Sequence, residues 1–206
     1  FFTRIMSDSD VAVVLILWFA LIILGLFTFT KTVKIVRHAE CMIIERLGEY
    51  KFTLKPGLHF LVPFIEYPRH IRWRYLSCEA GSTVATPRHV DTDRIDMREH
   101  VIDFQRRHVI TKDTVQIEVD ALVYYRIRDA RAAVFNVANL PAAIELLTQS
   151  TLRNIIASMS LDETFSSRER VNAELLDRIA PDAERWGVTI IRVEIQNILP
   201  PNDIKQ

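Results

Sequence analysis

Hydrophobic and charged positions divide the chain into an apolar segment near its start and a longer part of mixed character. Residues 11–30 are twenty consecutive positions without a charged side chain. At about 1.5 Å per helical residue, such a run reaches about 30 Å, the thickness of the hydrocarbon core of a bilayer. The pattern predicts a transmembrane helix over 11–30, preceded by a short flank over 1–10.

The charges on either side of this run indicate its orientation. Asp8 and Asp10 precede it, whereas Lys31, Lys34 and Arg37 follow it. Basic flanks tend to stay on the side where the protein is made, so the following domain is expected in the cytosol or in an organelle matrix. A cleaved signal peptide fits poorly, because the run is longer than a usual signal core and the charge order is reversed. The lack of a central proline favours a crossing helix over a re-entrant hairpin.

Strand-like stretches and turn signals follow the apolar segment. Residues 40–46 and 50–54 are rich in β-forming side chains and predict the two arms of a hairpin. Lys55-Pro56-Gly57 is a strong turn signal after the second arm.

The next eight residues, 58–65, include six large apolar side chains and one proline. They are too few to cross a bilayer. The run is either a buried strand that ends at Pro63 or a loop that dips into the membrane face, where the nearby anchor would hold it against lipid. On the second hypothesis, the membrane-contacting residues are Leu58, Phe60, Leu61, Val62, Phe64 and Ile65.

Residues 67–98 show the least regular pattern and predict loops with short strands. They are rich in Arg and His and include Trp73 and Tyr75. Such a basic and aromatic mixture is either a solvated surface or a contact for phosphates and lipid headgroups.

A regular alternation marks the clearest strand of the chain. Apolar side chains occupy every second position from Val115 to Ile127, which predicts a long strand with one buried face. Residues 108–111 precede it across a Lys112-Asp113 turn, so an antiparallel hairpin is expected. Residues 188–198 predict a final strand.

Helical spacing of apolar residues separates these strands. Asp129 is expected to cap a short helix that ends at Phe135. Pro141 suits the first turn of a longer helix, since its missing N–H does no harm there.

A last helix is predicted to end at Gly187. Asp162 is expected to cap a short turn before it, and Ser166 with Glu169 predicts a capping box at its start. Pro181 should kink this helix. The order of elements predicts an α+β fold with a small antiparallel sheet and helices packed on one side.

Composition and motifs give no sign of catalytic or nucleic-acid chemistry. Lys plus Arg and Asp plus Glu both number 26, so no basic field indicates nucleic acid as a partner. The chain lacks a nucleophile elbow, a phosphate loop, a His-Glu-x-x-His pair and a Cys-x-x-Cys pair. The six histidines are scattered without the helical spacing of a metal site. We expect no catalytic residue, cofactor or metal, and a protein that acts by binding and assembly.

Two cysteines, Cys41 and Cys78, do not make a disulfide scaffold. We predict two free thiols. Because Cys41 lies close after the apolar run, acylation of its thiol is a second hypothesis.

Several motifs are specific in combination. They lie at residues 45–50, 54–64, 110–113, 119–127, 146–154, 186–188, 192–195 and 200–201. The first two, Glu-Arg-Leu-Gly-Glu-Tyr and Leu-Lys-Pro-Gly-Leu-His-Phe-Leu-Val-Pro-Phe, resemble a signature of stomatin and its relatives. The next two resemble the central hairpin of these proteins, and 146–154 resembles their long helix. Over roughly 36–206 the chain thus resembles the SPFH or band 7 superfamily, which groups stomatins, prohibitins, flotillins and the bacterial HflK and HflC pair.

The resemblance implies a division of the chain into parts. A first β-rich SPFH subdomain is expected over 36–104, with an insertion near 78–96 relative to typical members. A second, α+β subdomain is expected over 105–200. Residues 201–206 are expected to begin a C-terminal helix that drives assembly in relatives.

The resemblance also implies a function. Relatives are non-enzymatic, membrane-anchored scaffolds that assemble many copies, alone or with a paralogue, into rings or cages. They organise lipid microdomains and recruit or regulate membrane proteins such as proteases and channels. The expected location is a plasma, inner or mitochondrial inner membrane, crossed once. Two alternatives stay open: a docking subunit of another membrane complex, and a membrane-anchored hydrolase with a nucleophile and base that no motif identifies.

Overall fold

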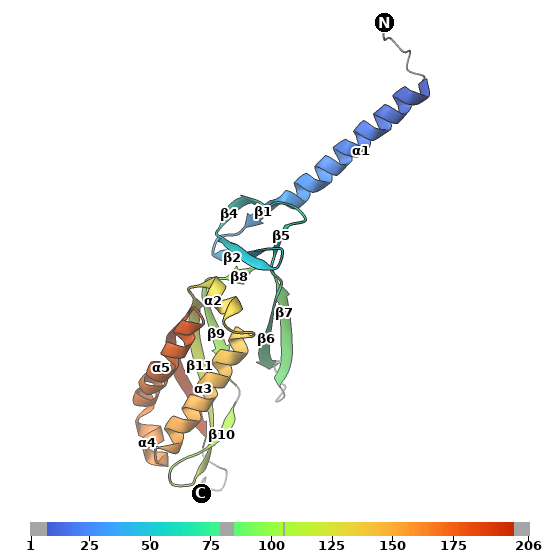
Figure 1. The fold of residues 1–206 in the computed structure, drawn as a ribbon. Coiled ribbons are helices and arrows are strands. Elements are labelled where there is room, and N and C mark those ends of the chain that lie inside the picture. The colour runs from blue at the N-terminus through green and yellow to red at the C-terminus, as the bar shows by residue number, and fades with distance from the viewer. Residues whose placement is uncertain (1–7, 79–84, 105, 200–206) are drawn as a thin grey trace.

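The computed structural model describes residues 8–78, 85–104 and 106–199, and within these the side chains of 8–12, 24, 26–31, 74–78 and 85–88 lie outside the description. Figure 1 shows a long helix, α1, that projects from a β-rich head, with α3, α4 and α5 toward the far end of that head and α2 beside β8. The predicted start of a helix at 201–206 lies outside the described residues.

Helix α1 (Asp8–Thr32) contains the whole uncharged run. Its described large side chains, from Val13 to Ile23, are all exposed. The transmembrane helix predicted over 11–30 is not confirmed, because no helix among the described residues is both long and apolar enough to cross a membrane. In α1 the side chains of 8–12, 24 and 26–31 lie outside the description.

A small β unit follows α1 directly and surrounds its own core. A two-stranded antiparallel ribbon consists of β1 (Val33–Val36) and β4 (Gly57–Phe60). The central strand β2 (Glu40–Arg46) pairs with β3 (Glu49–Leu54), β5 (Glu66–Pro68) and β8 (Ile95–Asp96). The predicted hairpin of 40–46 and 50–54 is therefore confirmed. The buried core of this unit comprises Val36, Met42, Ile44, Leu54 and Leu61.

A long hairpin replaces the loops predicted for residues 67–98. Strands β6 (Ile71–Cys78) and β7 (Ala85–Thr92) pair antiparallel along all eight residues of each. Short strands were predicted here, and β5 and β8 agree with that prediction. The long arms were not predicted, because Pro87 and the polar side chains of 85–92 give no strand pattern. The expected insertion near 78–96 falls partly on this hairpin and partly on residues outside the description.

A four-stranded antiparallel sheet forms the far end of the head. Strand β11 (Gln116–Ile127) pairs with β12 (Val188–Leu199) on one side, and with β9 (Glu99–Asp103) and β10 (Arg107–Ile110) on the other. The odd-numbered residues of β11 from Ile117 to Ile127 are all buried, as the alternation predicted. The predicted hairpin with residues 108–111 is confirmed.

Within the described residues, four helices accompany this sheet, and two of them cover its buried face. They are α2 (Ala130–Phe135), α3 (Leu140–Ala157), α4 (Leu161–Ser166) and α5 (Arg168–Arg185). In Figure 1, α3 and α5 lie side by side in front of β9 and β11. Antiparallel sheets with packed helices confirm the predicted α+β class.

Local signals account for most helix ends. The Asp129 carboxylate accepts from the N–H groups of Arg131 and Ala132, as predicted for a cap. Pro141 lies in the first turn of α3, also as predicted.

The capping box, however, lies six residues before its predicted place. Ser160 and Glu163 form it, at the start of α4, and Asp162 lies inside the first turn instead of capping it. Because α4 ends at Ser166, α5 begins after Ser167, whose side chain makes no capping bond. Helix α5 continues without interruption through Pro181.

The main core connects the two predicted subdomains. It contains Cys41 and Ile43 of β2 and Trp73 of β6, together with Tyr125 of β11 and Ile155 of α3. The boundary near 104 stays a prediction, and side chains from both sides of it share this core.

An aromatic contact fixes the small β unit against α2. The ring of Phe135 meets that of Tyr50 edge-on, with centroids 5.8 Å apart. The guanidinium of Arg69 lies 4.8 Å from the centroid of Phe135 and also pairs with Glu45. Such contacts contribute beyond the buried area alone, so the small unit has a defined orientation on the large one.

Candidate membrane-facing surface

Five of the six predicted membrane-contacting residues are exposed. Phe64 is 80% exposed and Phe60 is 65% exposed. Leu58, Val62 and Ile65 are also among the exposed large hydrophobic side chains. The alternative prediction of a buried strand is therefore wrong for these residues, although Gly57–Phe60 does form strand β4.

Leu61 differs from its neighbours. Its side chain is 3% exposed and belongs to the core of the small β unit. Its inclusion among the membrane-contacting residues was wrong for this conformation, because strand β4 ends at Phe60 and the chain turns Leu61 inward. Leu61 instead anchors the exposed residues on either side of it.

Strand pairing adds two residues that the sequence did not reveal. Ile35 lies directly opposite Leu58 in the ribbon of β1 and β4 and is 64% exposed. Directly opposed side chains share a face of an antiparallel pair, so Ile35 extends the same surface. The N–H of Leu47 donates to the carbonyl of Ile65 at 3.3 Å, and Leu47 is also exposed. We define the apolar patch as Ile35, Leu47, Leu58, Phe60, Val62, Phe64 and Ile65.

The apolar patch is tied to the end of α1. The N–H of Leu61 donates to the carbonyl of Thr32, the last residue of α1, at 2.8 Å. Strand β1 begins at the next residue, Val33, so no linker separates the helix from the ribbon. The patch therefore lies where α1 leaves the head, as Figure 1 shows for β1 and β4.

Glu66 holds the loop that carries Val62 and Phe64. Its carboxylate accepts from the N–H of Val62 at 3.0 Å and from Arg46 Nη2 at 2.5 Å. The N–H of Glu66 in turn donates to the carbonyl of Val62 at 3.0 Å. The Val62 N–H, and secondly Arg46, lower the pKa of Glu66 below its usual value. The loop is thus preformed around a buried carboxylate.

Two residues of the apolar patch have left-handed backbone conformations. Phe64 has a φ of 69° and Leu47 a φ of 52°. For residues with a side chain this region costs about 1–2 kcal/mol. Neither residue gains core packing in exchange, and backbone strain of this kind is typical of functional positions.

Basic residues accompany the apolar patch. Lys34 lies opposite His59 in the ribbon, and His59 Nε2 lies 2.7 Å from the carbonyl of Lys55. Within the described part of the chain, neither lysine forms an ion pair. Lys34 and His59 alternate with Ile35 and Leu58, so they point to the other face of the ribbon. Within a Debye length of a membrane surface, a lysine there still attracts anionic headgroups.

Other candidate chemistry is not supported near this surface. Cys41 is buried, and burial raises the pKa of its thiol to about 11, so the acylation hypothesis lacks an accessible thiolate. The side chain of Cys78 lies outside the description. Over the described ranges, no three His, Cys, Asp or Glu side chains gather as a metal site would require.

Comparison with known proteins identifies a family model and several relatives that match this chain. The family model described as "SPFH domain / Band 7 family" matches residues 34–206. An uncharacterized protein of Methanocaldococcus jannaschii is 38% identical over 188 residues, which cover 91% of this chain and 82% of that protein. Stomatin-like protein 2, mitochondrial, of Homo sapiens is 29% identical over 174 residues, 84% of this chain and 42% of that protein.

A third relative extends the range of organisms. An uncharacterized protein of Mycobacterium tuberculosis is 34% identical over 185 residues, 90% of this chain and 42% of that protein. The chain thus spans most of the archaeal relative and less than half of the other two. Since the family model covers most of the chain, the chain belongs to the SPFH domain/Band 7 family.

Proposed function

We propose that this protein is a membrane-anchored, non-enzymatic scaffold whose head rests on the lipid surface through the apolar patch. The observation that carries the proposal is the position of the patch at the end of α1. Seven exposed large apolar side chains are grouped where an uncharged helix leaves the fold. Exposed apolar patches of this kind are rare on soluble monomers and are typical of interaction sites.

In this proposal α1 anchors the chain in a bilayer. The uncharged run of residues 11–30 supports this role, and so do the exposed side chains from Val13 to Ile23. The basic residues after the run favour a head on the cytosolic or matrix side. A helix fixed in lipid would hold the adjoining ribbon at headgroup depth, where Phe60 and Phe64 can enter the acyl boundary.

The scaffold role requires many copies of the chain, each of which makes the same weak lipid contact. Many copies side by side, alone or with a paralogue, would combine modest lipid contacts into firm attachment. A ring of such copies requires a head-to-tail interface between neighbours. Family membership supports this assembly, the ordering of lipid around it and the recruitment of membrane proteases or channels.

The proposal is tested with vesicles and a variant that lacks residues 1–30. Replacing Phe60 and Phe64 with Asp should weaken its binding to liposomes by more than about tenfold, since burial of one large apolar side chain contributes about 1.5–3 kcal/mol. Co-flotation with liposomes gives the bound fraction, and circular dichroism checks the fold of each variant.

A matched control uses an exposed residue far from the patch. Leu146 on α3 is 64% exposed, close to the value for Phe60. Leu146→Asp should leave liposome binding unchanged. The proposed contact is refuted if the shortened protein never binds liposomes, or if Leu146→Asp weakens binding as much as the double Phe change.

A further inference from the structure

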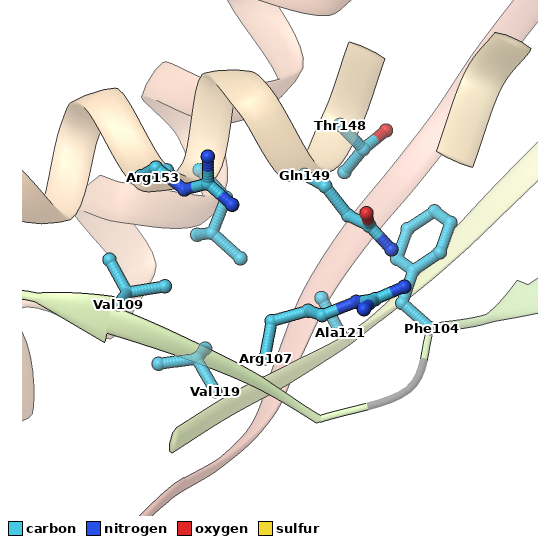
Figure 2. A pocket seen from close by; sticks show the side chains of 9 residues that line it. Phe104, Arg107, Val109, Val119, Ala121, Thr148, Gln149 and Arg153 are labelled. Carbon is cyan, nitrogen blue, oxygen red and sulfur yellow. The ribbon is translucent and has the colours of Figure 1, made fainter. Parts of the chain in front are cut away.

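A hollow lies between α3 and the strands β10 and β11, away from the apolar patch. It measures about 360 Å³ with the open solvent at its mouth. Its floor is apolar and its rim is polar (Figure 2). The floor consists of Phe104, Val109, Val119, Ala121 and Leu152, and the rim of Arg107, Gln149 and Arg153.

Two arginines at the rim lack a counter-charge. Figure 2 shows Arg153 reaching from α3 and Arg107 lying along the opposite wall. Over the described residues, neither guanidinium makes a hydrogen bond or an ion pair. Arg106, next to Arg107 in the chain, does pair with Asp120 at 3.5 Å. Two unpaired guanidinium groups above an apolar floor favour a carboxylate that is attached to an apolar body.

The wall of the hollow also contains a buried hydroxyl without a partner. Thr148 is 0% exposed, and its Oγ1 has no hydrogen-bond partner in the described structure. Buried hydroxyls are normally satisfied, so this one is unusual. In Figure 2 its oxygen points away from Arg107. Thr adopts two rotamers in helices, and the other one would redirect the hydroxyl.

The size and position of the hollow limit its occupant. The hollow has internal room for about one water molecule, so an acyl chain does not fit and a partner's charged group would stay at the arginine rim. In Figure 1 α3 and β10 lie at the end of the head opposite α1, so a headgroup of the same membrane does not reach them. An acidic side chain from another polypeptide satisfies both limits.

An exposed side chain on α3 indicates which kind of residue lies next to the acidic one in the partner. Leu146 precedes Gln149 by three positions and Arg153 by seven, so all three share one face of α3. Leu146 is an exposed large hydrophobic residue that belongs to neither core. A partner that offers a carboxylate to the arginines can therefore place an adjacent apolar residue on Leu146.

We propose that this hollow binds an acidic–apolar segment of a partner protein, with its carboxylate between Arg107 and Arg153. The inference gives a chemistry to the partner of the proposed scaffold and rests on that role. Peptide binding, however, needs no membrane, so its failure is distinguishable from failure of the membrane contact.

The experiment uses the full chain in detergent and fluorescein-labelled peptides. The probe is Gly-Ser-Leu-Glu-Leu-Ser-Gly, and its comparison peptide has Gln in place of Glu. We expect the Glu peptide to bind at least tenfold more tightly by fluorescence anisotropy, with weaker binding at high salt. Arg107→Gln and Arg153→Gln should each lower its affinity at least tenfold. Arg168→Gln, at an exposed position on α5, should not.

Other outcomes overturn the proposal. Equal binding of the Glu and Gln peptides, no binding, or unchanged affinity in both arginine variants refutes carboxylate recognition. Acetate that competes at the same concentration as the peptide would make the site one for small carboxylates. A lower oligomeric mass of Arg107→Gln by mass photometry, without peptide binding by the parent chain, would make the occupant a second copy. Circular dichroism confirms the fold of each variant.

Discussion

Phe64 combines an exposed aromatic ring with a left-handed backbone, and each of these features costs free energy. Its ring is 80% exposed and its φ is 69°. A residue chosen for stability at this position would be glycine or asparagine. The side chain is therefore better explained by a contact outside the chain than by folding.

Phe64→Gly separates these two effects. Because glycine accepts this φ without strain and little packing is lost, we expect the free energy of unfolding to rise by about 0.5–1 kcal/mol. Liposome binding of the chain without residues 1–30 should fall at the same time. Urea unfolding and co-flotation measure the two quantities. A clear loss of stability would mean that the ring packs within the fold.

Gly187→Ala should be strongly destabilising. A Cβ at this position would lie 2.5 Å from the carbonyl oxygen of Asp129 and 2.8 Å from Ala132 Cβ, at a φ of 72°. We expect a loss of at least about 2 kcal/mol in urea unfolding.

Gly48→Ala is the matched control for this change. Its φ is 91°, but nothing lies within 4 Å of an added Cβ. Only the backbone term applies, so the loss should be about 1–2 kcal/mol. Equal losses at Gly48 and Gly187 would contradict the close approach at Gly187.

For single residues, the sequence predicted which segment is apolar but not which of its side chains are buried and which are exposed. It identified the apolar run 58–65, but it could not separate the buried Leu61 from the exposed Phe60 and Phe64. That separation depends on where β4 ends. Ile35 could not be assigned to the patch either, because its place depends on pairing with Leu58 across the ribbon.

Among the structural elements, the loop from Leu61 to Glu66 depends on one carboxylate. Glu66 bonds Val62 and Arg46, and both partners lower its pKa below the usual 4.5. A lowered pKa in the folded state means that the ionised form stabilises the fold. This contribution is complete above pH 4.5 and is lost as the pH falls through the lower, folded-state pKa.

Glu66→Gln should therefore reduce stability at neutral pH and reduce it less in acid. The neutral amide can still accept from Val62, but it loses the charge that Arg46 complements. Denaturant unfolding of both proteins from pH 7 down to pH 3 measures the difference. A difference that grows on acidification would contradict the assigned role of the carboxylate.

Elements with a strong local pattern were predicted well. The alternation of β11, the cap at Asp129 and the first-turn position of Pro141 needed no tertiary information. The β6–β7 hairpin was missed because its second arm, 85–92, contains Pro87 and lacks an alternation of apolar and polar side chains. The capping box was misplaced because Ser160 and Ser166 both suit a cap, and only the packing of α4 decides between them.

In the whole molecule, the two candidate surfaces lie at opposite ends of the head (Figure 1). The apolar patch adjoins α1, whereas the hollow with Arg107 and Arg153 adjoins α3 and β10 (Figure 1). A contact with lipid at one end leaves the other free for protein partners. The run 58–65 predicted most of the apolar patch, whereas the hollow combines residues that are distant in the chain and follows from no motif.

Charge should make the lipid contact selective. Lys34→Gln and Lys55→Gln, in the chain without residues 1–30, should each weaken binding to anionic vesicles by about fivefold, or about 1 kcal/mol. Binding to neutral vesicles should change little. Lys112→Gln, an exposed lysine beyond β10, is the control. Equal effects of all three changes would argue against a specific headgroup contact.

The direct succession of Thr32 and Val33 has a consequence for assembly. A flexible linker would let each domain rotate relative to its anchor, and neighbouring copies would meet in many orientations. Here α1 continues into β1 without an intervening residue, and the N–H of Leu61 bonds to the carbonyl of Thr32 at the junction. In a bilayer, the rotation of α1 about its own axis would thus fix the orientation of the domain that follows it. Neighbouring copies would then approach one another in matching orientations.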